Sequence, residues 1–399
     1  MTGTLFLAHR LPFPPDRGDK IRSFNLLKAL ARLGPVHVAS FAENPADLAN
    51  AMELQGLATS LCLPLRDKSM VQSGMEALLR REPVSLAAFH HHRIGEWVAD
   101  TLRQQQIDAI YVFSGQMGQY VPARWQGPLV VDLVDVDSAK FEAYAGTHSW
   151  PMSWIDAREA RLLRAEEARL AARADHTLLV SEAEAELLRS RLPHGTRAQV
   201  SALGNGIDAD LFDPAKVQPH RQLGQGPHIV FTGQMDYPPN VAAALRGIGQ
   251  ILPALRRVHP HAQFHVVGRA PVAELLAHDG QHGCRIWGEV EDVRPFLAAA
   301  DAVLVPLELA RGVQNKVLEA MAMARPVVLT TPAATGIGAV DGEHLAVHDA
   351  DDALAAAVLA LLADPEQAQS MGARARQFVV DHRSWPAMLT DLPRLLTRG

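Results

Sequence analysis

The sequence has few cysteines and no long apolar run. Only Cys62 and Cys284 occur among its 399 residues, one in each half, so they cannot build a disulfide framework or a metal cluster. Such scarcity fits a reducing cytoplasm. The longest apolar candidate, residues 353–363, is shorter than the roughly 20 residues that a transmembrane helix needs. The first residues carry no basic leader before a short apolar run, so we expect a cytoplasmic protein without a secretory signal.

A complete dinucleotide-binding fingerprint is also missing. Such a fingerprint places Gly-x-Gly-x-x-Gly between a strand and a helix, because its glycines let the backbone approach a pyrophosphate. The glycine pairs at 247 and 249 and at 336 and 338 both lack the third glycine. The sequence therefore disfavours an enzyme that uses a nicotinamide cofactor.

The length and composition indicate a globular protein with two domains. Hydrophobic residues make up 48% of the chain and charged residues 21%, as in ordinary globular proteins. A chain of this length favours two cores over one. Gly204-Asn205-Gly206 precedes a segment rich in Pro, Gly and Gln that runs to Pro227, and glycines permit the backbone angles of a hinge. We predict a boundary there, between domains of residues 1–203 and 204–380.

The net charge is weakly negative and unevenly placed. It is −6 for the chain, and residues 204–399 hold 16 Lys and Arg against 21 Asp and Glu, which gives −5 for that part. A negative chain disfavours nucleic acid as a partner. The near-neutral first half faces an anionic surface more easily. We therefore consider a membrane-surface contact through the N-terminal domain, at the inner face of the membrane.

Short apolar runs alternate with helical patterns in both halves. Predicted buried strands of the first half are 5–8, 36–41, 110–113, 129–133 and 177–180. Helices are predicted at 21–33, at about 155–173 and from Glu182, which Ser181 is placed to cap. Predicted strands of the second half are 228–232, 264–267, 302–306 and 326–330, with helices from Val241 and near Gln314. This alternation predicts an α/β chain with doubly wound parallel sheets.

Residues 301–331 combine a strand, a glycine-containing turn, a helix and a second strand. Ligands bind such units outside the carboxyl ends of the strands, where a helix N-terminus attracts anions. Gly312 permits close backbone approach, and Arg311 and Lys316 add positive charge. Glu319 follows Lys316 by three residues on the same helix, and a ribose diol is the obvious donor to such a carboxylate. We predict that a nucleoside diphosphate binds here.

The helix and strand of this stretch resemble a known site. Lys-Val-Leu-Glu-Ala-Met-Ala at 316–322, followed by Arg-Pro-Val-Val at 325–328, resembles the nucleotide-sugar site of family 4 retaining glycosyltransferases of the GT-B fold. That family commonly has two Glu residues eight positions apart; Glu319 matches the second, and Arg311 stands at the first. Together with Gly-Gln-Met-Asp-Tyr-Pro-Pro-Asn at 233–240, the stretch is similar to sugar transferases associated with exosortase-type exopolysaccharide systems.

The resemblance implies a fold and a donor site. The fold would be two Rossmann-like domains with a cleft between them, and a tail helix of residues 381–399 would cross back to the N-terminal domain. Gln234 and Asn240 stand where most members carry a cationic clamp for the diphosphate, so Arg311 and Lys316 would compensate. The donor-binding residues that we predict are Gly18, Gly233, Gln234, Asn240, Arg269, Gly288, Val290, Gly312, Val313, Gln314, Asn315 and Glu319.

Cations also gather in the segment Pro12–Arg22. Three prolines and one glycine predict a shaped loop before a helix, where Arg17, Lys20 and Arg22 are slightly unfavourable unless an anion is present. The segment resembles the first loop of GT-B glycosyltransferases, in which Gly18 would match the family's glycine. We predict that the three cations face an acceptor or phosphate; a solvated basic turn is the alternative.

Three aspartates lie close together at a strand end: Asp132, Asp135 and Asp137. Carboxylates so close repel one another, so some should face water, a cation or sugar hydroxyls. Asp135 stands roughly where many family 4 enzymes have a His that contacts the donor sugar. A metal site and a solvated strand end are the alternatives. Because the family's fold is usually independent of cations, we expect no metal.

The function that the resemblance implies is a retaining hexosyltransferase. It would move a sugar from a nucleotide diphosphate to a glycan or polyprenyl-linked acceptor in exopolysaccharide or envelope biosynthesis. The predicted catalytic residues are Lys316, Arg311 and Asp135, and no cofactor is expected besides the nucleotide sugar as substrate. The alternatives are a nucleotide-sugar epimerase or a glycogen- or sucrose-type glucosyltransferase of the same fold, and a catalytically silent nucleotide-sugar-binding subunit.

Overall fold

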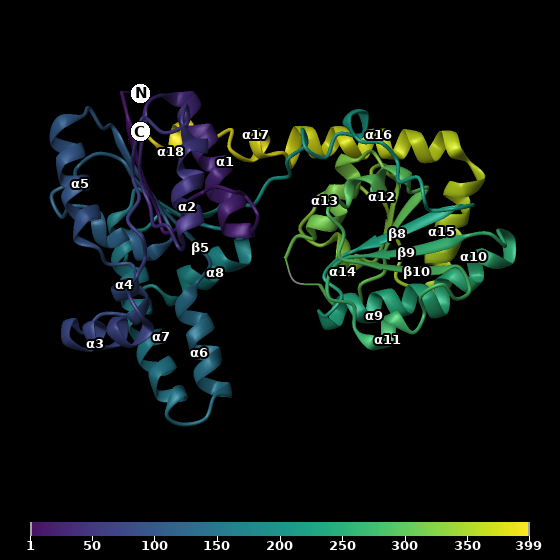
Figure 1. Ribbon diagram of the computed structural model, residues 1–399, viewed down its shortest axis with the longest axis horizontal. Coiled ribbons are helices and arrows are strands. Elements are labelled where there is room, and N and C mark those ends of the chain that lie inside the picture. Colours follow the sequence, from purple (N-terminus) through teal and green to yellow (C-terminus); the bar gives the residue numbers. More distant parts are fainter. Residues whose placement is uncertain (1, 311, 398–399) are drawn as a thin grey trace. The chain divides into compact units, whose positions relative to one another are not determined.

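The computed structural model describes residues 2–310 and 312–397, which form two compact units. The first unit comprises the chain up to Asn205 together with the segment that begins at Met388, and the second runs from Gly206 to Ala387. The chain thus leaves the first unit two residues after the predicted boundary. Each unit holds one parallel sheet with helices on both faces (Figure 1).

The sheet of the first unit has the order β3-β2-β1-β4-β5-β6-β7, and all its pairings are parallel. Its strands are β1 (Thr4–Ala8), β2 (Val36–Ala39), β3 (Ser60–Cys62), β4 (Ala109–Phe113), β5 (Leu129–Val134), β6 (His176–Leu179) and β7 (Val200–Ala202). Every residue of β1 and β4 is buried, because helices cover both faces of a parallel sheet. The strand order reverses between β1 and β4, as in a doubly wound domain.

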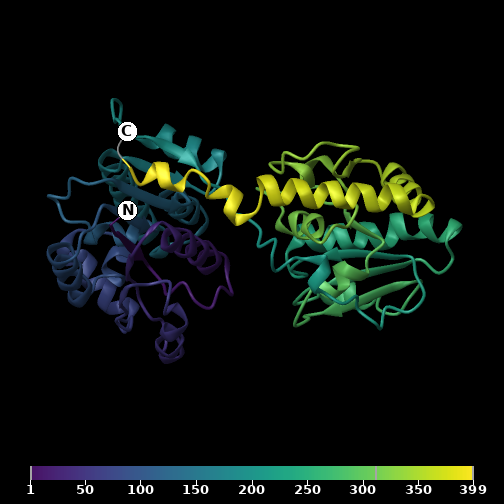
Figure 2. The same ribbon diagram turned by 90° about the horizontal axis from the view of Figure 1, so that it is seen from above.

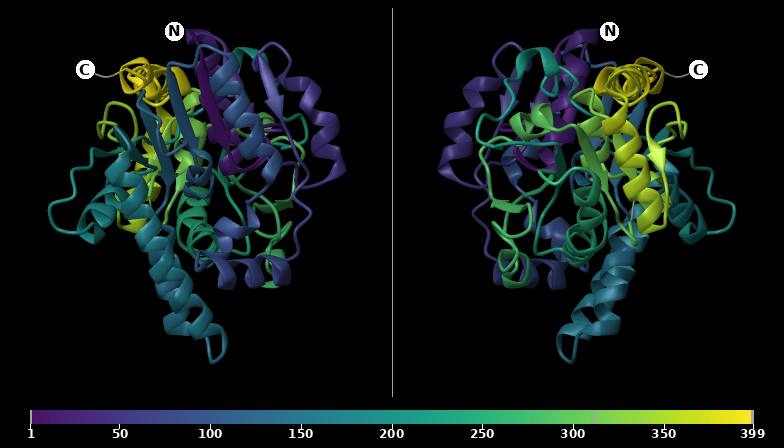
Figure 3. Two further views of the ribbon diagram at one scale, coloured as in Figure 1. Left: turned by 90° about the vertical axis from the view of Figure 1, so that its left-hand side faces the viewer. Right: turned by 90° about the vertical axis from the view of Figure 1, so that its right-hand side faces the viewer.

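Helices of the first unit connect these strands. They are α1 (Gly18–Leu33), α2 (Pro45–Asn50), η1 (Ala51–Leu54), α3 (Met70–Arg80), α4 (Val84–Ala88), α5 (His92–Gln104), η2 (Gly115–Tyr120), α6 (Asp137–Thr147), α7 (Met152–Arg173), α8 (Glu182–Arg191) and α18 (Leu392–Leu395). Ser181 accepts a hydrogen bond from the Glu184 N–H and caps α8, as predicted. The α6–α7 hairpin extends beyond the rest of this unit (Figure 3).

The sheet of the second unit has the order β10-β9-β8-β11-β12-β13 and is also parallel. Its strands are β8 (His228–Thr232), β9 (Gln263–Val267), β10 (Cys284–Gly288), β11 (Ala302–Val305), β12 (Val327–Leu329) and β13 (Ala346–Val347). Its helices are η3 (Pro214–Lys216), α9 (Pro238–Arg246), the π-helical turn η4 (Gly247–Ile251), α10 (Leu252–Val258), α11 (Ala273–Leu276), α12 (Arg294–Ala299), α13 (Asn315–Ala322), α14 (Thr331–Ala334), α15 (Asp351–Ala363) and α16 (Pro365–His382). The prediction of two doubly wound, Rossmann-like domains is therefore confirmed.

Helices α9 and α11 lie on one face of this second sheet, and α12, α13 and α16 lie on the other (Figure 1). Helix α16, in yellow, runs along the outside of the unit (Figure 2). The order reverses between β8 and β11, so the carboxyl ends of these two strands form the switch point where ligands bind in such sheets.

Two predicted segments differ from the structure. The shaped loop ends at Arg17, because Gly18 already begins α1 and Lys20 and Arg22 therefore lie on a helix. The predicted tail helix is instead the end of α16 followed by the short helices α17 (Trp385–Met388) and α18. The backbone groups of Arg383 and Trp385 pair with Ile207 rather than continuing the helix, which explains the break. In the residues that the structure describes, no helix is long and apolar enough to cross a membrane.

Candidate functional site

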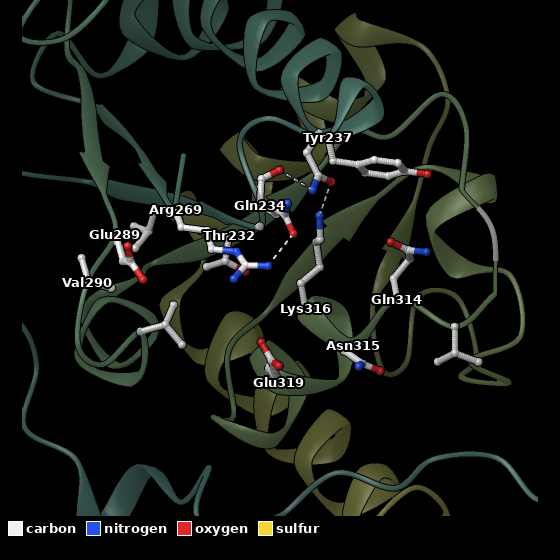
Figure 4. A pocket seen from close by; sticks show the side chains of 16 residues that line it. Thr232, Gln234, Tyr237, Arg269, Glu289, Val290, Gln314, Asn315, Lys316 and Glu319 are labelled. Atoms are coloured by element: carbon white, nitrogen blue, oxygen red, sulfur yellow. Dashed lines mark hydrogen bonds between the residues drawn. The ribbon is translucent and has the colours of Figure 1, made fainter. Parts of the chain in front are cut away.

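A cavity of about 560 Å³ opens at the switch point of the second unit (Figure 4). The turn after β8, the ends of β9 and β10, and the first turns of α13 form its walls. The residues that line it are Thr232, Gly233, Gln234, Tyr237, Asn240, Val267, Gly268, Arg269, Glu289, Val290, Val293, Val313, Gln314, Asn315, Lys316 and Glu319. Its size suits a ligand of the dimensions of a nucleotide.

Two glycines let the backbones and side chains of the cavity wall come together. A Cβ at Gly233 would lie 2.9 Å from both Lys316 Nζ and Asn240 Nδ2. A Cβ at Gly268 would lie 1.6 Å from the Gly233 carbonyl oxygen, so the turns after β8 and β9 touch through bare backbone. A side chain at either position would therefore displace the polar groups that line the cavity.

Lys316 is held at the cavity by an amide and an aromatic ring. Its Nζ donates to Asn240 Oδ1 at 2.5 Å and lies 4.7 Å from the centre of the Phe231 ring. The Asn240 side chain donates in turn to the Gln234 carbonyl oxygen at 2.9 Å, which fixes the amide. Burial lowers the pKa of Lys316 to about 8, although Glu319 partly opposes this effect. At neutral pH most Lys316 side chains therefore still carry a positive charge.

The N-terminus of α13 lies beside this cation. Gln314 is the N-cap residue but makes no side-chain cap; its Nε2 donates to the Gly312 carbonyl oxygen at 3.2 Å. The first N–H groups of a helix have no acceptor within the helix, and they carry part of its positive dipole. Gly312 has φ 64°, a left-handed conformation that favours glycine in the turn before α13. These groups and Lys316 form an anion-binding end of the cavity.

Glu319 lies one turn further along α13 and also lines the cavity (Figure 4). Burial raises the pKa of its carboxyl group, and the nearby Lys316 partly opposes this effect. Such a carboxylate can accept hydrogen bonds from ligand hydroxyl groups. Because it would repel a phosphate, phosphate recognition does not explain its place near the anion-binding end. Its position fits a ligand that carries a diol next to its phosphates.

The opposite wall is more exposed and mixed in charge. Arg269 Nη2 donates to Gln234 Oε1 at 3.0 Å, and both side chains lie at the surface of the cavity. Glu289 and Val290 follow β10, whose last residue, Gly288, has φ 66° and accepts a hydrogen bond from the Gly268 N–H at 2.9 Å. This wall offers backbone groups that can form hydrogen bonds with a planar base and short apolar side chains that can pack against it.

Residues 226–364, which contain all of this cavity, match a family described as "Glycosyl transferases group 1". The C-terminal part of the chain resembles that family. Glycogen synthase of Mycobacterium tuberculosis is 27% identical over 257 residues, which cover 62% of this chain and 59% of that protein. A GDP-mannose-dependent alpha-(1-6)-phosphatidylinositol monomannoside mannosyltransferase of Mycolicibacterium smegmatis is 29% identical over 223 residues, 51% of this chain and 57% of that protein. The chain thus spans less than two thirds of the length of these curated relatives.

Solved structures show the same fold. The crystal structure of Anabaena Alr3699/HepE in complex with UDP aligns with a TM-score of 0.60 and 16% sequence identity, and the alignment covers 99% of each chain. The chain therefore has the GT-B fold, which consists of two Rossmann-like domains.

Most of the predicted donor residues of the second half line the cavity. They are Gly233, Gln234, Asn240, Arg269, Val290, Val313, Gln314, Asn315, Lys316 and Glu319. Gly288 and Gly312 lie next to it and shape the turns, and Arg311 lies outside the described residues. Glu289, which lies between the predicted Gly288 and Val290, also lines the cavity, and so do Thr232, Tyr237, Val267, Gly268 and Val293, which were not predicted. Thr232, Val267 and Gly268 lie at or just after strand ends, which was the signal that would have found them, whereas Tyr237 and Val293 are the N-cap residues of α9 and α12.

The cations of the first helix are placed differently from the prediction. Lys20 is buried and its Nζ lies 3.3 Å from Asp47 Oδ1. Arg22 is fully buried; its Nε donates to Asp132 Oδ2 at 2.9 Å, and its Nη1 donates to Asn205 Oδ1 at 3.0 Å. Neither side chain is open to an acceptor or a phosphate. This corrects the assignment of both residues, because buried carboxylates already neutralise them.

Asp132 and Asp135 have different environments. Asp132 is fully buried against Arg22 and the Tyr111 hydroxyl group, which donates to it at 3.0 Å. Asp135 is partly exposed, and Lys140 Nζ lies 3.0 Å from Asp135 Oδ2 and 3.1 Å from Asp137 Oδ1. Lys140 thus offsets the repulsion between the carboxylates of Asp135 and Asp137. In the part of the chain that the structure describes, no group of three or more His, Cys, Asp or Glu is placed to hold a metal ion.

The predicted Arg17 lies after β1 in a set of charged side chains whose other members were not predicted. Arg10 Nε donates to Glu43 Oε1 at 2.7 Å, and Arg10 Nη1 donates to Asp19 Oδ2 at 2.8 Å. Arg17 also pairs with Glu43, and Arg66 Nη2 lies 3.4 Å from the same carboxylate. Although burial raises the pKa of Glu43, its hydrogen bonds from Arg10 and Arg17 lower it below the usual value. Arg17 is also paired with carboxylates, but its side chain is 44% exposed and therefore accessible, unlike the buried Lys20 and Arg22.

Proposed function

We propose that the protein is a retaining glycosyltransferase that moves a sugar from a nucleotide diphosphate donor to a glycan or polyprenyl-linked acceptor. One observation carries the proposal: a cation, a helix N-terminus and a carboxylate one turn along the same helix line a single cavity. The cation and the helix end suit a diphosphate, and the carboxylate suits the ribose diol beside it. A role in exopolysaccharide or envelope biosynthesis is supported by the resemblance of residues 233–240 and 311–319.

The proposed chemistry makes the nucleoside diphosphate the leaving group. The bond between the anomeric carbon and the phosphate oxygen breaks, and the acceptor oxygen forms a new bond to the same face of that carbon. The proton of the acceptor hydroxyl group passes to the departing phosphate oxygen. Negative charge grows on the diphosphate, and Lys316 and the first N–H groups of α13 stabilise it in a partly desolvated site.

The base of the donor is left open between two supported possibilities. The structural neighbour from Anabaena has been solved with UDP and with UDP-glucose, whereas the mannosyltransferase relative is named for GDP-mannose. Gly288, Glu289 and Val290 are the proposed neighbours of the base in this chain.

The acceptor side is proposed to involve the first unit. Arg10, Arg17 and Arg66 share Glu43, so a phosphate group of an acceptor could replace that carboxylate as their partner. Gly18 and Asp135, which belong to the same unit, remain proposed contacts of the donor sugar and phosphates by resemblance.

Nucleotide-dependent thermal stabilisation tests the donor site. Purified protein would be heated with UDP, GDP, ADP or dTDP, and a nucleotide at a hundred times its dissociation constant should add about 2.7 kcal/mol of stability. We expect stabilisation by one base, lost in Lys316→Ala and in Glu319→Ala. An absence of stabilisation by every nucleotide would exclude the proposed site.

Product analysis then tests the reaction. With the matching nucleotide sugar and an acceptor fraction, we expect the free nucleoside diphosphate and a glycosylated acceptor in equal amounts. Lys316→Ala should slow turnover about ten- to a hundredfold, because it removes charge stabilisation worth about 1.5–3 kcal/mol. Binding without any turnover would indicate a silent binding subunit, and an isomerised sugar that stays on the nucleotide would indicate an epimerase.

A further inference from the structure

The side of the cavity opposite α13 is built on two neighbouring strand ends. Strands β9 and β10 are paired in parallel, and the Gly268 N–H donates to the Gly288 carbonyl oxygen at 2.9 Å where they end. Arg269 and Glu289 follow these two glycines, so both residues stand at the same edge of the sheet. Figure 4 shows Glu289 on one side of the cavity and Asn315, the first residue of α13, on the other. A ligand that reaches from α13 across the cavity therefore meets Glu289 at its far end.

Glu289 keeps both of its carboxylate oxygens open to a ligand. It is exposed, lines the cavity, and forms no hydrogen bond or ion pair with another residue that the structure describes. Arg269, on the neighbouring strand end, is held instead by Gln234, to whose Oε1 its Nη2 donates at 3.0 Å. Among the described residues that line the cavity, the other acidic one is Glu319, which lies near Lys316 on α13. The far side of the cavity thus carries a carboxylate that no described side chain neutralises.

The anion-binding end fixes the direction in which a nucleotide lies in the cavity. Lys316 and the first turn of α13 suit the diphosphate, and Glu319, one turn further along, suits the ribose diol. A nucleotide carries its diphosphate, ribose and base in that order. The base therefore lies against the remaining wall, which includes Glu289, Val290 and Val293.

The common nucleobases differ in the donors that they offer to a carboxylate. Guanine has two adjacent donors, N1–H and the 2-amino group, which can bind the two oxygens of one carboxylate side by side. Uracil and thymine have a single N–H between two carbonyl oxygens, and those oxygens repel a carboxylate. Adenine and cytosine have an amino group beside a ring nitrogen that carries a lone pair. A carboxylate without a protein partner at the base therefore favours guanine over the other four bases.

Given the proposed donor site, on which this inference rests, we propose that the donor is a guanosine diphosphate sugar and that Glu289 selects its base. The Glu289 carboxylate accepts hydrogen bonds from guanine N1–H and the 2-amino group, and Val290 and Val293 pack against the ring. Glu289 contacts the base and takes no part in the transfer step. Its replacement should therefore change which nucleotide binds and not how the bound donor reacts.

Nucleotide titration of the full chain tests the selection of guanine. Calorimetric titration would compare GDP with inosine diphosphate, which lacks the 2-amino group, and with UDP. We expect inosine diphosphate to bind about tenfold more weakly than GDP, because one charge-assisted hydrogen bond is lost, and UDP about a hundredfold more weakly. If UDP or another nucleoside diphosphate binds as tightly as GDP, the proposed donor site stands and the selection of guanine is overturned. If no nucleotide binds, the donor site fails and the selection of guanine fails with it.

The variant Glu289→Gln adds a gain of binding that a loss of structure cannot produce. Its amide can donate where the carboxylate only accepts, so it matches xanthosine diphosphate, which carries a carbonyl oxygen in place of the 2-amino group. We expect the variant to bind GDP about tenfold more weakly than the original protein, and xanthosine diphosphate about tenfold more tightly. Glu291→Gln is the matched control, because Glu291 is also exposed but is not among the residues that line the cavity, and both affinities should stay unchanged there. Unchanged affinities for both nucleotides in Glu289→Gln would overturn the role of Glu289.

Discussion

Lys316 and Asn240 join the first turn of α13 to the start of α9, with 2.5 Å between the ammonium nitrogen and the amide oxygen. An amide oxygen positions the ammonium group without neutralising it. The positive charge therefore stays available to a ligand, although burial makes it unfavourable when the cavity holds none. The buried charge that serves ligand binding therefore lowers the stability of the protein without ligand.

Replacing Lys316 by methionine should stabilise the free protein and abolish nucleotide binding. The lowered pKa shows that the charged form is disfavoured in the folded state, so a neutral side chain of similar length should raise the free energy of unfolding by about 1–2 kcal/mol. Urea denaturation and nucleotide titration would measure the two effects. Lys216→Met, at a lysine that is 58% exposed, is the control and should change neither. A destabilised Lys316→Met protein would contradict this account.

Nucleotide affinity should fall as the pH rises through about 8. The charged form of Lys316 is the one that binds a diphosphate, and its pKa in the free protein is about 8. Above that pH the dissociation constant should rise toward about tenfold per pH unit, as one proton is needed for binding. Calorimetric titration between pH 7 and 9 would measure this slope. The slope should disappear in Lys316→Met, and a slope that persists there would assign the proton to another group.

The same lysine gives the free protein a defined dependence of stability on pH. Its folded-state pKa of about 8 lies below the ordinary value of 10.5, so the unfolded chain binds more protons between these two values. The contribution of Lys316 to stability should therefore increase with pH from about 8 to 10.5. The difference in unfolding free energy between the original protein and Lys316→Met should shrink over that window. A difference that stays constant would contradict the lowered pKa.

Glu319→Gln should weaken binding through the ribose hydroxyl groups. A neutral amide accepts a weaker hydrogen bond than a carboxylate, so affinity for the matching nucleoside diphosphate should fall about three- to tenfold. Affinity for the 2′,3′-dideoxy nucleotide should be equal in the two proteins, because that ligand lacks the donors. Equal losses for both ligands would remove the diol from the interpretation. Burial raises the pKa of Glu319, so its charged form is disfavoured in the folded protein. The Glu319→Gln protein without ligand should therefore be no less stable than the original protein.

Gly233→Ala should weaken nucleotide binding and also lower stability somewhat, because Gly233 has φ 158°. The added Cβ would lie 2.9 Å from both Lys316 Nζ and Asn240 Nδ2, so these groups must move. We expect affinity to fall about tenfold, because a small displacement of charged groups is costly in a preorganised site. Gly280→Ala is the matched control, since Gly280 also has a positive φ, of 73°, and a Cβ there meets nothing within 4 Å. Equal affinities in both variants would show that the tight contact is unimportant.

Arg22→Met should act on stability rather than on ligand binding. The substitution leaves Asp132 buried without its cation, which should lower the free energy of unfolding by about 3–5 kcal/mol. The double variant Arg22→Met/Asp132→Leu should recover much of this loss, because no unpaired charge remains. Nucleotide titration of the surviving folded protein should be unchanged. If the Arg22→Met protein were fully stable but no longer bound the nucleotide, Arg22 would be a phosphate ligand after all.

Local patterns were enough to predict much of the fold and the donor cavity. The strand of residues 129–133 and the capping of α8 by Ser181 follow from neighbouring residues, and the structure shows both. Lys316 and Glu319 lie on one helix, so their spacing alone placed them near each other. The region that holds α2 to α5 was not predicted; α2 and α4 are short, and α3 reverses the usual orientation of its apolar face.

The sequence by itself determined the two doubly wound sheets and the anion-binding helix end, because strand periodicity, turn glycines and helix spacing act between residues close in the chain. The tertiary structure alone decided which charges are free. Arg22 and Lys20 looked like phosphate ligands until folding paired them with Asp132 and Asp47, 110 and 27 positions away. It also placed Gly233 under the Lys316 ammonium group. Charge pairing and close packing depend on distance in space, which sequence separation does not encode.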